Sequence, residues 1–287
     1  MTIKKICVIG AGQMGQQIAL GAAINGFDVI LNDSFDTALE KADKWSKEYL
    51  AGRIEKGKMT QTEAEAAQSR FKIEKDLAMA AQAADLVIEA IVEKLDIKRE
   101  LFARLDRLCP AHAILASNTS SFVPSKLADA TTRPDKVVDM HFFNPALVME
   151  LVEVVQGPQT SDETAQAIMQ VSRQMQKTPI LLKKEINGFV VNRILGRTFE
   201  EACRLLALGI ASPEDIDIAV TKGLRWPMGP CATMDLSGID TCYNIRVQRF
   251  AESQEEIDRP PAILKEMLDA GTLGRKSGKG FYDYSKK

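Results

Sequence analysis

The stretch Ile3-Lys4-Lys5-Ile6-Cys7-Val8-Ile9-Gly10-Ala11-Gly12-Gln13-Met14-Gly15 decides the fold. Residues 3–9 are mostly apolar with little alternation, which is typical of a strand buried on both faces in a parallel sheet. An alanine-rich stretch follows the glycines and ends at Asn25-Gly26, a typical helix C-cap. A second apolar run, Phe27–Asn32, completes a strand–helix–strand unit of about 30 residues.

Gly10, Gly12 and Gly15 have the spacing GxGxxG, which in this context predicts a dinucleotide-binding turn. The first glycine permits a tight turn, the second lets the backbone approach a pyrophosphate, and the third lets helix and strand pack closely. The free N–H groups at the helix N-terminus favour phosphate. Asp33 ends the second strand, where a carboxylate accepts hydrogen bonds from both ribose hydroxyls of NAD and repels the extra phosphate of NADP. NAD is therefore the predicted cofactor.

The rest of the chain extends this unit into two domains. Strand and helix patterns alternate up to residue 183, and a capping box at Thr60–Glu63 splits one charged helical region in two. After Gly188 the helical patterns follow one another without strands, and Ser212-Pro213 marks one helix start. We predict an α/β fold with a Rossmann-type, doubly wound, mostly parallel sheet in domain 1–185, followed by an all-helical C-terminal domain over residues 186–287. The later predicted strands are 85–91, 113–117, 136–142, 151–156 and 179–183, and the longer helices are 95–108, 162–175 and 189–208.

The composition argues against several classes of function. The chain has 37 basic and 39 acidic residues and a net charge of -2, so neither nucleic acid nor an anionic membrane is an expected partner. No apolar run reaches the roughly 20 residues needed to span a bilayer, and the N-terminus lacks a signal peptide's longer apolar region. The cysteines are odd in number and form no CxxC pair, which favours buried thiols in a reducing cytoplasm over disulfides or a metal site.

Only two histidines are available as a general base near neutral pH. His112 lies in a short helix-to-strand link and is expected to be solvated. His141 closes an apolar strand, and the carboxyl ends of parallel strands are where ligands bind in open α/β sheets. At that place His141 can take a hydroxyl proton while a hydride leaves the same carbon. The alternative is a buried structural histidine.

Two further polar features interrupt or follow apolar strands. The run Ser117-Asn118-Thr119-Ser120-Ser121 can supply hydrogen bonds to a substrate oxygen, and it suits a turn or a helix N-cap equally well. Glu153 lies inside the apolar strand Leu151-Val152-Glu153-Val154-Val155, where a carboxylate is costly to bury unless it is paired. A protonated histidine is its natural partner. A strand face open to water would leave Glu153 solvated instead.

Several segments together resemble the 3-hydroxyacyl-CoA dehydrogenase family, particularly its short 3-hydroxybutyryl-CoA dehydrogenase members. The resemblance extends over nearly the whole chain, with the segments in the family's order. These segments are the glycine motif, Asp85-Leu86-Val87-Ile88-Glu89-Ala90, Ser117–Ser121, His141-Phe142-Phe143-Asn144-Pro145, Gly188-Phe189-Val190-Val191-Asn192-Arg193 and Gly274-Arg275-Lys276-Ser277-Gly278-Lys279-Gly280-Phe281-Tyr282.

The resemblance implies a reaction, in which (S)-3-hydroxyacyl-CoA, most closely the 3-hydroxybutyryl thioester, and 3-ketoacyl-CoA are interconverted by hydride transfer to or from NAD. By position, His141 corresponds to the family's general acid/base and Glu153 to its carboxylate partner. Ser120 corresponds to the catalytic serine, and Asn192 to an asparagine that helps to hold the substrate oxygen. Lys56 falls near a lysine that meets CoA, although a solvated lysine fits the charged segment equally. The positions implied to contact NAD are Glu93, Lys98, Asn144 and Lys276.

The resemblance also implies a homodimer whose interface is formed by the helical domain. The chain departs from the family at a few positions. Asp139 stands where the family usually has Gly before the Met-His pair, and Asn187 stands where it usually has Pro. The segment Leu224-Arg225-Trp226-Pro227 is bulkier than usual. These departures bear on the substrate range more than on the chemistry.

Two alternative functions stay open from the sequence. Chains with the same scaffold that resemble lens lambda-crystallins act on free sugar acids, so a free hydroxy or sugar acid is an alternative substrate. CoA needs several basic contacts for its phosphates, and Arg53, Lys56 and Lys58 could supply them. The other alternative is a non-catalytic nucleotide-binding protein, which would not require the four catalytic side chains together.

Overall fold

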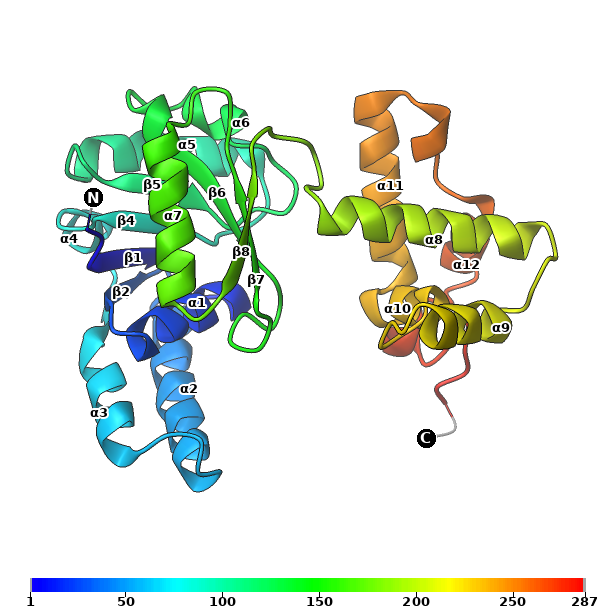
Figure 1. Ribbon diagram of the computed structural model, residues 1–287, viewed down its shortest axis with the longest axis horizontal. Coiled ribbons are helices and arrows are strands. Elements are labelled where there is room, and N and C mark those ends of the chain that lie inside the picture. The colour runs from blue at the N-terminus through cyan, green and yellow to red at the C-terminus, as the bar shows by residue number, and fades with distance from the viewer. Residues whose placement is uncertain (1, 286–287) are drawn as a thin grey trace. The chain divides into compact units, whose positions relative to one another are not determined.

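The computed structural model describes residues 2–285, which fold as two compact units divided between Val190 and Val191. The first unit contains a sheet with helices on both sides, and the second consists of helices (Figure 1). The division between the units falls a few residues beyond the boundary that we expected at residues 185 and 186.

An eight-stranded sheet forms the centre of the first unit. Its strands are β1 (Lys5–Ile9), β2 (Asp28–Asn32), β3 (Phe71–Glu74), β4 (Leu86–Glu89), β5 (Ile114–Ser117), β6 (Val137–Phe142), β7 (Leu151–Val155) and β8 (Thr178–Leu182). They lie in the order β3-β2-β1-β4-β5-β6-β7-β8, and every neighbouring pair is parallel except β6 and β7. The first six positions have the strand order of a Rossmann sheet, so the predicted fold class is confirmed.

Helices cover both faces of this sheet and explain the long apolar strands. The helices are α1 (Gln13–Ile24), α2 (Asp36–Glu55), α3 (Gln61–Arg70), α4 (Leu77–Ala81), α5 (Leu95–Leu108), α6 (Ser125–Ala128) and α7 (Asp162–Gln174), with a 3-10 turn at Pro134–Lys136. On one face α1, α2, α3 and α7 contribute Ile18, Leu39, Ala64 and Ile168 to the core. On the other face α4, α5 and α6 contribute side chains such as Phe102. Figure 1 shows α7 lying along the sheet.

Local sequence signals place most helix ends correctly. The Thr60 side chain accepts a hydrogen bond from the Glu63 amide at 3.2 Å, and the Glu63 carboxylate accepts one from the Thr60 amide at 2.8 Å, so the capping box is confirmed. Strand β3 and the short helices α4 and α6 were missed. Strand β3 lies at the sheet edge and carries charged residues, so it lacks the apolar run of the buried strands. Helix α4 has a readable start, because Asp76 accepts a hydrogen bond from the Met79 amide at 2.9 Å.

The second unit is a helical assembly with its own apolar core. Its helices are α8 (Val191–Ala207), α9 (Pro213–Ile218), α10 (Pro230–Ser237), α11 (Ile239–Ser253) and α12 (Ala262–Asp269), with shorter helical turns at Ala219–Gly223, Glu256–Asp258 and Arg275–Ser277. Cys203, Met234 and Leu264 are among the buried core residues. The Ser212 hydroxyl accepts a hydrogen bond from the Asp215 amide at 3.1 Å, which confirms the predicted helix start. None of the described helices is both long and apolar enough to cross a membrane.

Candidate active site

The glycine turn between β1 and α1 fits a bound dinucleotide. Gly10 has φ of 103°, which L side chains rarely adopt, and a Cβ on Gly15 would lie 1.8 Å from the Gly10 carbonyl oxygen. A Cβ on Gly12 would have no heavy atom within 4 Å, so that side of the turn is open space. The helix N-terminus behind it presents N–H groups suited to phosphate. The turn therefore has close packing at Gly15 and an open approach at Gly12, as a pyrophosphate site requires.

A cavity of about 1160 Å³ extends from this turn along the carboxyl ends of β1 and β2. Gly10, Gly12 and Asp33 are among its lining residues. Asp33 Oδ2 accepts a hydrogen bond from the Ala11 amide at 2.7 Å, and Oδ1 accepts one from the Phe35 amide at 3.0 Å. These backbone contacts fix the carboxylate in place. Each oxygen retains a lone pair for a ribose hydroxyl, because an ionised carboxylate has about four acceptor positions.

His141 and Glu153 face each other across the antiparallel pair of strands β6 and β7. The register of β6 and β7 sets these two residues directly opposite, and His141 Nδ1 lies 2.8 Å from Glu153 Oε2. Glu153 is fully buried, and the His141 residue is 6% exposed. Glu153 Oε1 also accepts a hydrogen bond from the Val190 amide at 3.0 Å. The pair is thus a buried, anchored contact in the part of β6 that approaches its carboxyl end.

Aromatic rings enclose the His141 imidazole. The Phe143 ring centroid lies 4.5 Å from that of His141, and the Phe189 centroid lies 5.4 Å away, edge-on. These apolar walls limit the access of water to the ring. With Nδ1 directed at the Glu153 carboxylate, the imidazole orientation is set by a hydrogen bond rather than by packing alone.

The polar run after β5 is an ordered loop. The Ser117 hydroxyl donates to Glu89 Oε2 at 2.6 Å and accepts from the Thr119 amide at 3.2 Å. The Asn118 side-chain oxygen accepts from the Phe142 amide at 2.8 Å, which joins the end of β5 to the end of β6. Ser120 follows as an exposed residue. The loop is therefore a hydrogen-bonded turn that leaves Ser120 exposed, and the role of Ser120 toward a substrate oxygen stays a prediction.

Glu93 binds this loop directly, and Lys98 forms an ion pair with Glu93. Lys98 is 1% exposed, and its ammonium lies 2.6 Å from Glu89 Oε1 and 3.0 Å from Glu93 Oε2. Glu93 Oε1 accepts hydrogen bonds from the Ser120 and Ser121 amides, each at 3.1 Å. Burial alone would raise the pKa of Glu93, but Lys98 and the loop hydrogen bonds outweigh it and lower that pKa. Lys98 thus lies inside the protein, committed to two carboxylates.

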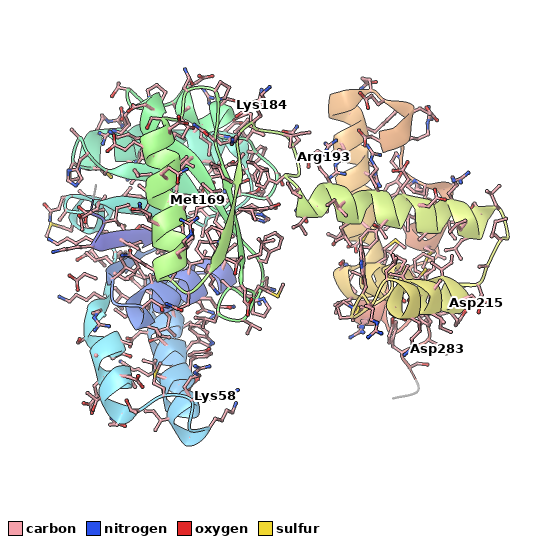
Figure 2. All side chains as sticks on the ribbon, viewed as in Figure 1. Lys58, Met169, Lys184, Arg193, Asp215 and Asp283 are labelled. Carbon is pink, nitrogen blue, oxygen red and sulfur yellow. The ribbon has the colours of Figure 1, made fainter. Side chains whose placement is uncertain are left out.

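The remaining predicted site residues are Asn144, Lys56, Asn192 and Lys276. Asn144 is exposed just beyond β6, and Lys56 is exposed at the C-terminal end of α2. Lys58, labelled in Figure 2, lies at the far end of the pair formed by α2 and α3. Asn192 and Lys276 belong to the helical unit.

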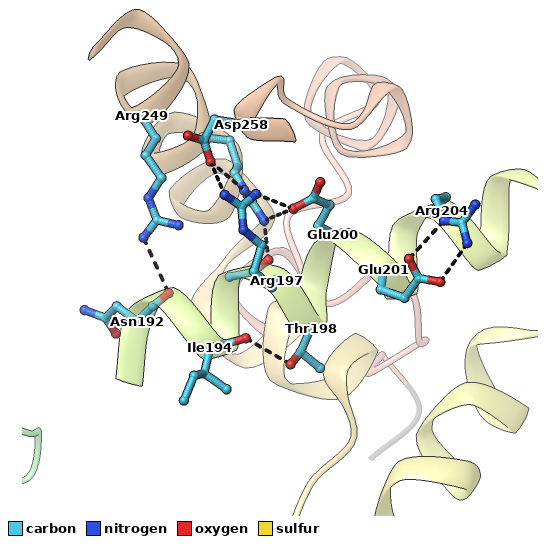
Figure 3. Close-up of polar contacts among 11 residues, drawn as sticks. Asn192, Ile194, Arg197, Thr198, Glu200, Glu201, Arg204, Arg249 and Asp258 are labelled. Carbon is cyan, nitrogen blue, oxygen red and sulfur yellow. Dashed lines mark hydrogen bonds and ion pairs between the residues drawn. The ribbon is translucent and has the colours of Figure 1, made fainter. Parts of the chain in front are cut away.

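The contacts described below for Asn192 and Lys276 are with other residues of the helical unit. The Asn192 carbonyl oxygen accepts a hydrogen bond from Arg249 at 3.4 Å, beside an ion-pair network in which Arg197 contacts both Glu200 and Asp258 (Figure 3). Lys276 forms an ion pair with Asp240. The roles that the resemblance implies for Asn192 and Lys276 stay predictions.

Sequence reasoning overlooked two groups that organise the site. Asn118 was given no role of its own in the polar run, although its position directly after a buried strand places it near the end of the next strand. The Val190 amide, which binds Glu153, carries no signal in the sequence because any residue type supplies a backbone N–H.

A Rossmann sheet with an open glycine turn and a buried histidine–carboxylate pair near its carboxyl edge defines a dinucleotide-dependent oxidoreductase. The chain belongs to the 3-hydroxyacyl-CoA dehydrogenase family: the model of the family's NAD binding domain matches residues 5–186, and that of its C-terminal domain matches residues 188–284. It is accordingly an NAD-dependent enzyme of that family.

Similar proteins agree with this assignment. A probable 3-hydroxybutyryl-CoA dehydrogenase of Bacillus subtilis is 45% identical over 287 residues, which cover 100% of this chain and 99% of the relative. The crystal structure of (S)-3-hydroxybutyryl-CoA dehydrogenase from Ralstonia eutropha is 40% identical, with a TM-score of 0.94 over 99% of this chain and 100% of the other. A diketoreductase structure, described for its catalysis of dicarbonyl compounds, is 36% identical, with a TM-score of 0.85 and the same coverage.

Proposed function

We propose that this enzyme interconverts short-chain (S)-3-hydroxyacyl-CoA and 3-ketoacyl-CoA, with 3-hydroxybutyryl-CoA as the preferred substrate. The observation that carries the proposal is the buried contact of 2.8 Å between His141 and Glu153. A secondary alcohol becomes a ketone only if a base removes its hydroxyl proton as the hydride departs. An imidazole oriented by a carboxylate is well suited to that task.

His141 is the proposed general acid/base. Because Nδ1 is held by Glu153, Nε2 is the nitrogen that we assign to the 3-hydroxyl of the substrate. In the oxidation Nε2 accepts the hydroxyl proton, and the buried Glu153 carboxylate stabilises the imidazolium that results. In the reverse direction Nε2 returns that proton to the carbonyl oxygen. NAD, when bound, supplies the hydride acceptor for the same carbon atom.

Ser120 is the proposed donor to the substrate oxygen. Its amide is held by Glu93, and its exposed side chain stands on the loop that joins β5 to α6. A hydroxyl at that place would stabilise the negative charge that develops on oxygen. Asn192 is proposed to assist it, as the family resemblance implies.

The glycine turn and Asp33 are the proposed NAD contacts, together with Glu93 and Asn144, which the family resemblance implies. Asp33 favours NAD over NADP because a second anion beside its carboxylate would be repelled. Lys98 and Lys276 complete the positions expected from the resemblance. For Lys98 we favour an indirect role, because its ammonium already lies within 3.0 Å of two carboxylates.

The acyl-CoA substrate and the assembly are proposed from the family. Lys56, exposed at the end of α2, is the candidate contact for the CoA portion. We propose a homodimer formed through the helical unit. A cytoplasmic location fits the five cysteines, all of which are free and buried.

A free dicarbonyl or hydroxy acid is the competing substrate class. The similarity to a diketoreductase favours it, since a chain of the same architecture is described as acting on dicarbonyl compounds. Recognition of a free acid would need a cation for its carboxylate, whereas CoA needs several for its phosphates. The basic residues near the end of α2 support the thioester.

The deciding experiment follows NADH absorbance after the protein is mixed with acetoacetyl-CoA. Parallel reactions replace NADH by NADPH, or the thioester by free acetoacetate. We expect rapid loss of NADH with acetoacetyl-CoA alone. A free acid that is reduced faster than its thioester would establish the competing class, and binding of NADH without turnover of any of these compounds would refute the proposed reaction.

A further inference from the structure

Three buried polar residues form a row across neighbouring parallel strands, one layer below the catalytic edge. Glu89 of β4 is in register with Ser117 of β5, and Ser117 is in register with Asp139 of β6. All three are fully buried. Residues paired in this way point to the same face of a sheet, and alternation along β6 puts His141 on that face too. Asp139 therefore lies on the same face of the sheet as His141, two residues before it on β6.

Asp139 differs from its neighbours because its carboxyl group has no partner. Both of its oxygens are buried and make no hydrogen bond to any described residue. Glu89, in contrast, accepts from the Ser117 hydroxyl and the Ile91 amide and contacts Lys98. An ionised carboxylate in such surroundings would carry a large desolvation cost. A protonated carboxyl group would carry far less.

The charges around Asp139 lead to the same conclusion. The acidic groups whose charge acts on Asp139 are Glu89 of β4, Glu93 after β4 and Glu185 after β8, and Lys98 of α5 acts on it with the opposite charge. Lys98 already serves two carboxylates, Glu89 and Glu93. Burial raises the pKa of Asp139 well above its usual range, Glu89 raises it further, and Lys98 opposes them only in part.

We propose that Asp139 keeps its proton in the folded enzyme at neutral pH and acts as a neutral positioning residue. As a neutral acid, it leaves the Lys98 ammonium to Glu89 and Glu93. Glu93 can then hold the Ser120 and Ser121 amides. An ionised Asp139 would compete for Lys98 and loosen the Ser120 loop. The link to Ser120 rests on the proposed function, whereas the protonation of Asp139 does not.

The direction in which stability changes with pH follows from the coupling between proton binding and folding. The folded state binds the Asp139 proton more tightly than the unfolded state, so protonation favours folding. This contribution is fully present below the unfolded pKa, near 4, and is lost progressively as pH rises toward the folded pKa. Over that window the unfolding equilibrium constant of the wild type should rise about tenfold per pH unit relative to that of a variant without the ionisable group.

Chemical denaturation of the wild type and Asp139→Asn between about pH 5 and pH 7 tests the proposal, because an unperturbed aspartate is already ionised there. Asp106→Asn is the control, since Asp106 accepts hydrogen bonds from the Thr132 amide and the Arg133 side chain, its pKa is lowered, and neither partner titrates in this range. We expect the ratio of the wild-type unfolding constant to that of the variant to rise with pH for Asp139→Asn and to stay level for Asp106→Asn. Asp139→Ala should give the same slope if the asparagine variant fails to fold, because only the ionisable group matters.

Two further measurements address the carboxyl group and the loop without any activity assay. Infrared difference spectra of the wild type against Asp139→Asn should contain the carbonyl stretch of a protonated acid at neutral pH. Hydrogen exchange at the Ser120 and Ser121 amides should be equally slow in both proteins. If the stability of the wild type and of Asp139→Asn depends on pH in the same way, and no infrared band of a protonated acid is found, Asp139 is not protonated and the proposal is wrong. Faster exchange of these two amides in the wild type than in the variant would rule out the positioning role.

Discussion

At the scale of single residues, His141 and Glu153 carry the proposed chemistry. Substituting each in turn distinguishes the role of the acid/base group from that of its carboxylate partner. His141→Gln removes the acid/base group, so we expect kcat for acetoacetyl-CoA reduction to fall by roughly 10²- to 10⁴-fold. Glu153→Gln keeps the shape of the partner but removes its charge, so the imidazolium is stabilised less and kcat should fall by a smaller factor. Steady-state kinetics with NADH measure both effects.

His112→Gln is the matched control for this pair of substitutions. His112 is the other histidine of the chain, and its Nε2 lies 3.0 Å from Asp85 Oδ1 on an exposed part of the first unit. Its loss should leave kcat near the wild-type value. Circular dichroism must show an intact fold in all three variants, and a His141→Gln enzyme that turns over at the wild-type rate would remove His141 from the mechanism.

The identity of these residues was predictable, but their arrangement was not. A histidine at a strand end and a carboxylate inside an apolar strand were both visible in the sequence, and the contact between them is confirmed. The antiparallel direction of β7, which sets Glu153 opposite His141, was not foreseen. The burial of Lys98 was hidden for a similar reason. A lysine in a charged amphipathic helix is normally solvated, and only the folded sheet brings Glu89 and Glu93 to its ammonium.

At the scale of elements, the turn between β1 and α1 allows cofactor binding and stability to be separated. Gly12→Ala adds a methyl group where no heavy atom lies within 4 Å, so the fold should survive. That methyl group would occupy the open approach of the pyrophosphate, so we expect at least a tenfold higher Kd for NADH, about 1.4 kcal/mol. Fluorescence titration with NADH measures the affinity, and denaturant unfolding measures the stability.

Gly15→Ala should behave in the opposite manner at the same turn. Its Cβ would lie 1.8 Å from the Gly10 carbonyl oxygen, so the turn or the helix must shift. We expect a clear loss of stability, in the range of roughly 1–3 kcal/mol that overpacking usually costs. A Gly12→Ala protein that binds NADH as tightly as the wild type, or a Gly15→Ala protein of unchanged stability, would contradict the assignment of the turn.

The elements of the first unit were predictable wherever their pattern was strong. Both faces of the sheet are covered by helices, so its central strands are continuous apolar runs that stand out in the sequence. Strand β3 escaped because Phe-Lys-Ile-Glu at a sheet edge needs no such run. Helix α4 escaped because five residues are too few to show a helical period, although Asp76 marks its start.

At the scale of the whole molecule, the two units differ in how they were recognised. The first was predicted from motifs, and the second mainly from the absence of strands after Gly188. The core of the second unit is small, and large apolar side chains remain on its surface, among them Ile218 and Leu224, which are 56% and 64% exposed. Exposed apolar side chains are removed from water when a partner covers them, which favours association. These side chains are therefore the first candidates for the proposed dimer interface.

The combined substitution Ile218→Glu and Leu224→Glu tests that interface. Two charges buried between subunits would repel the partner, so we expect the dimer to weaken at least tenfold, about 1.4 kcal/mol, in sedimentation velocity over a range of protein concentrations. Met79→Glu in the first unit is the matched control, because Met79 is also 56% exposed but lies on α4. A wild type that sediments as a monomer would refute the dimer itself. If Met79→Glu weakens the dimer as much as the double substitution does, the interface cannot be assigned to the helical unit alone.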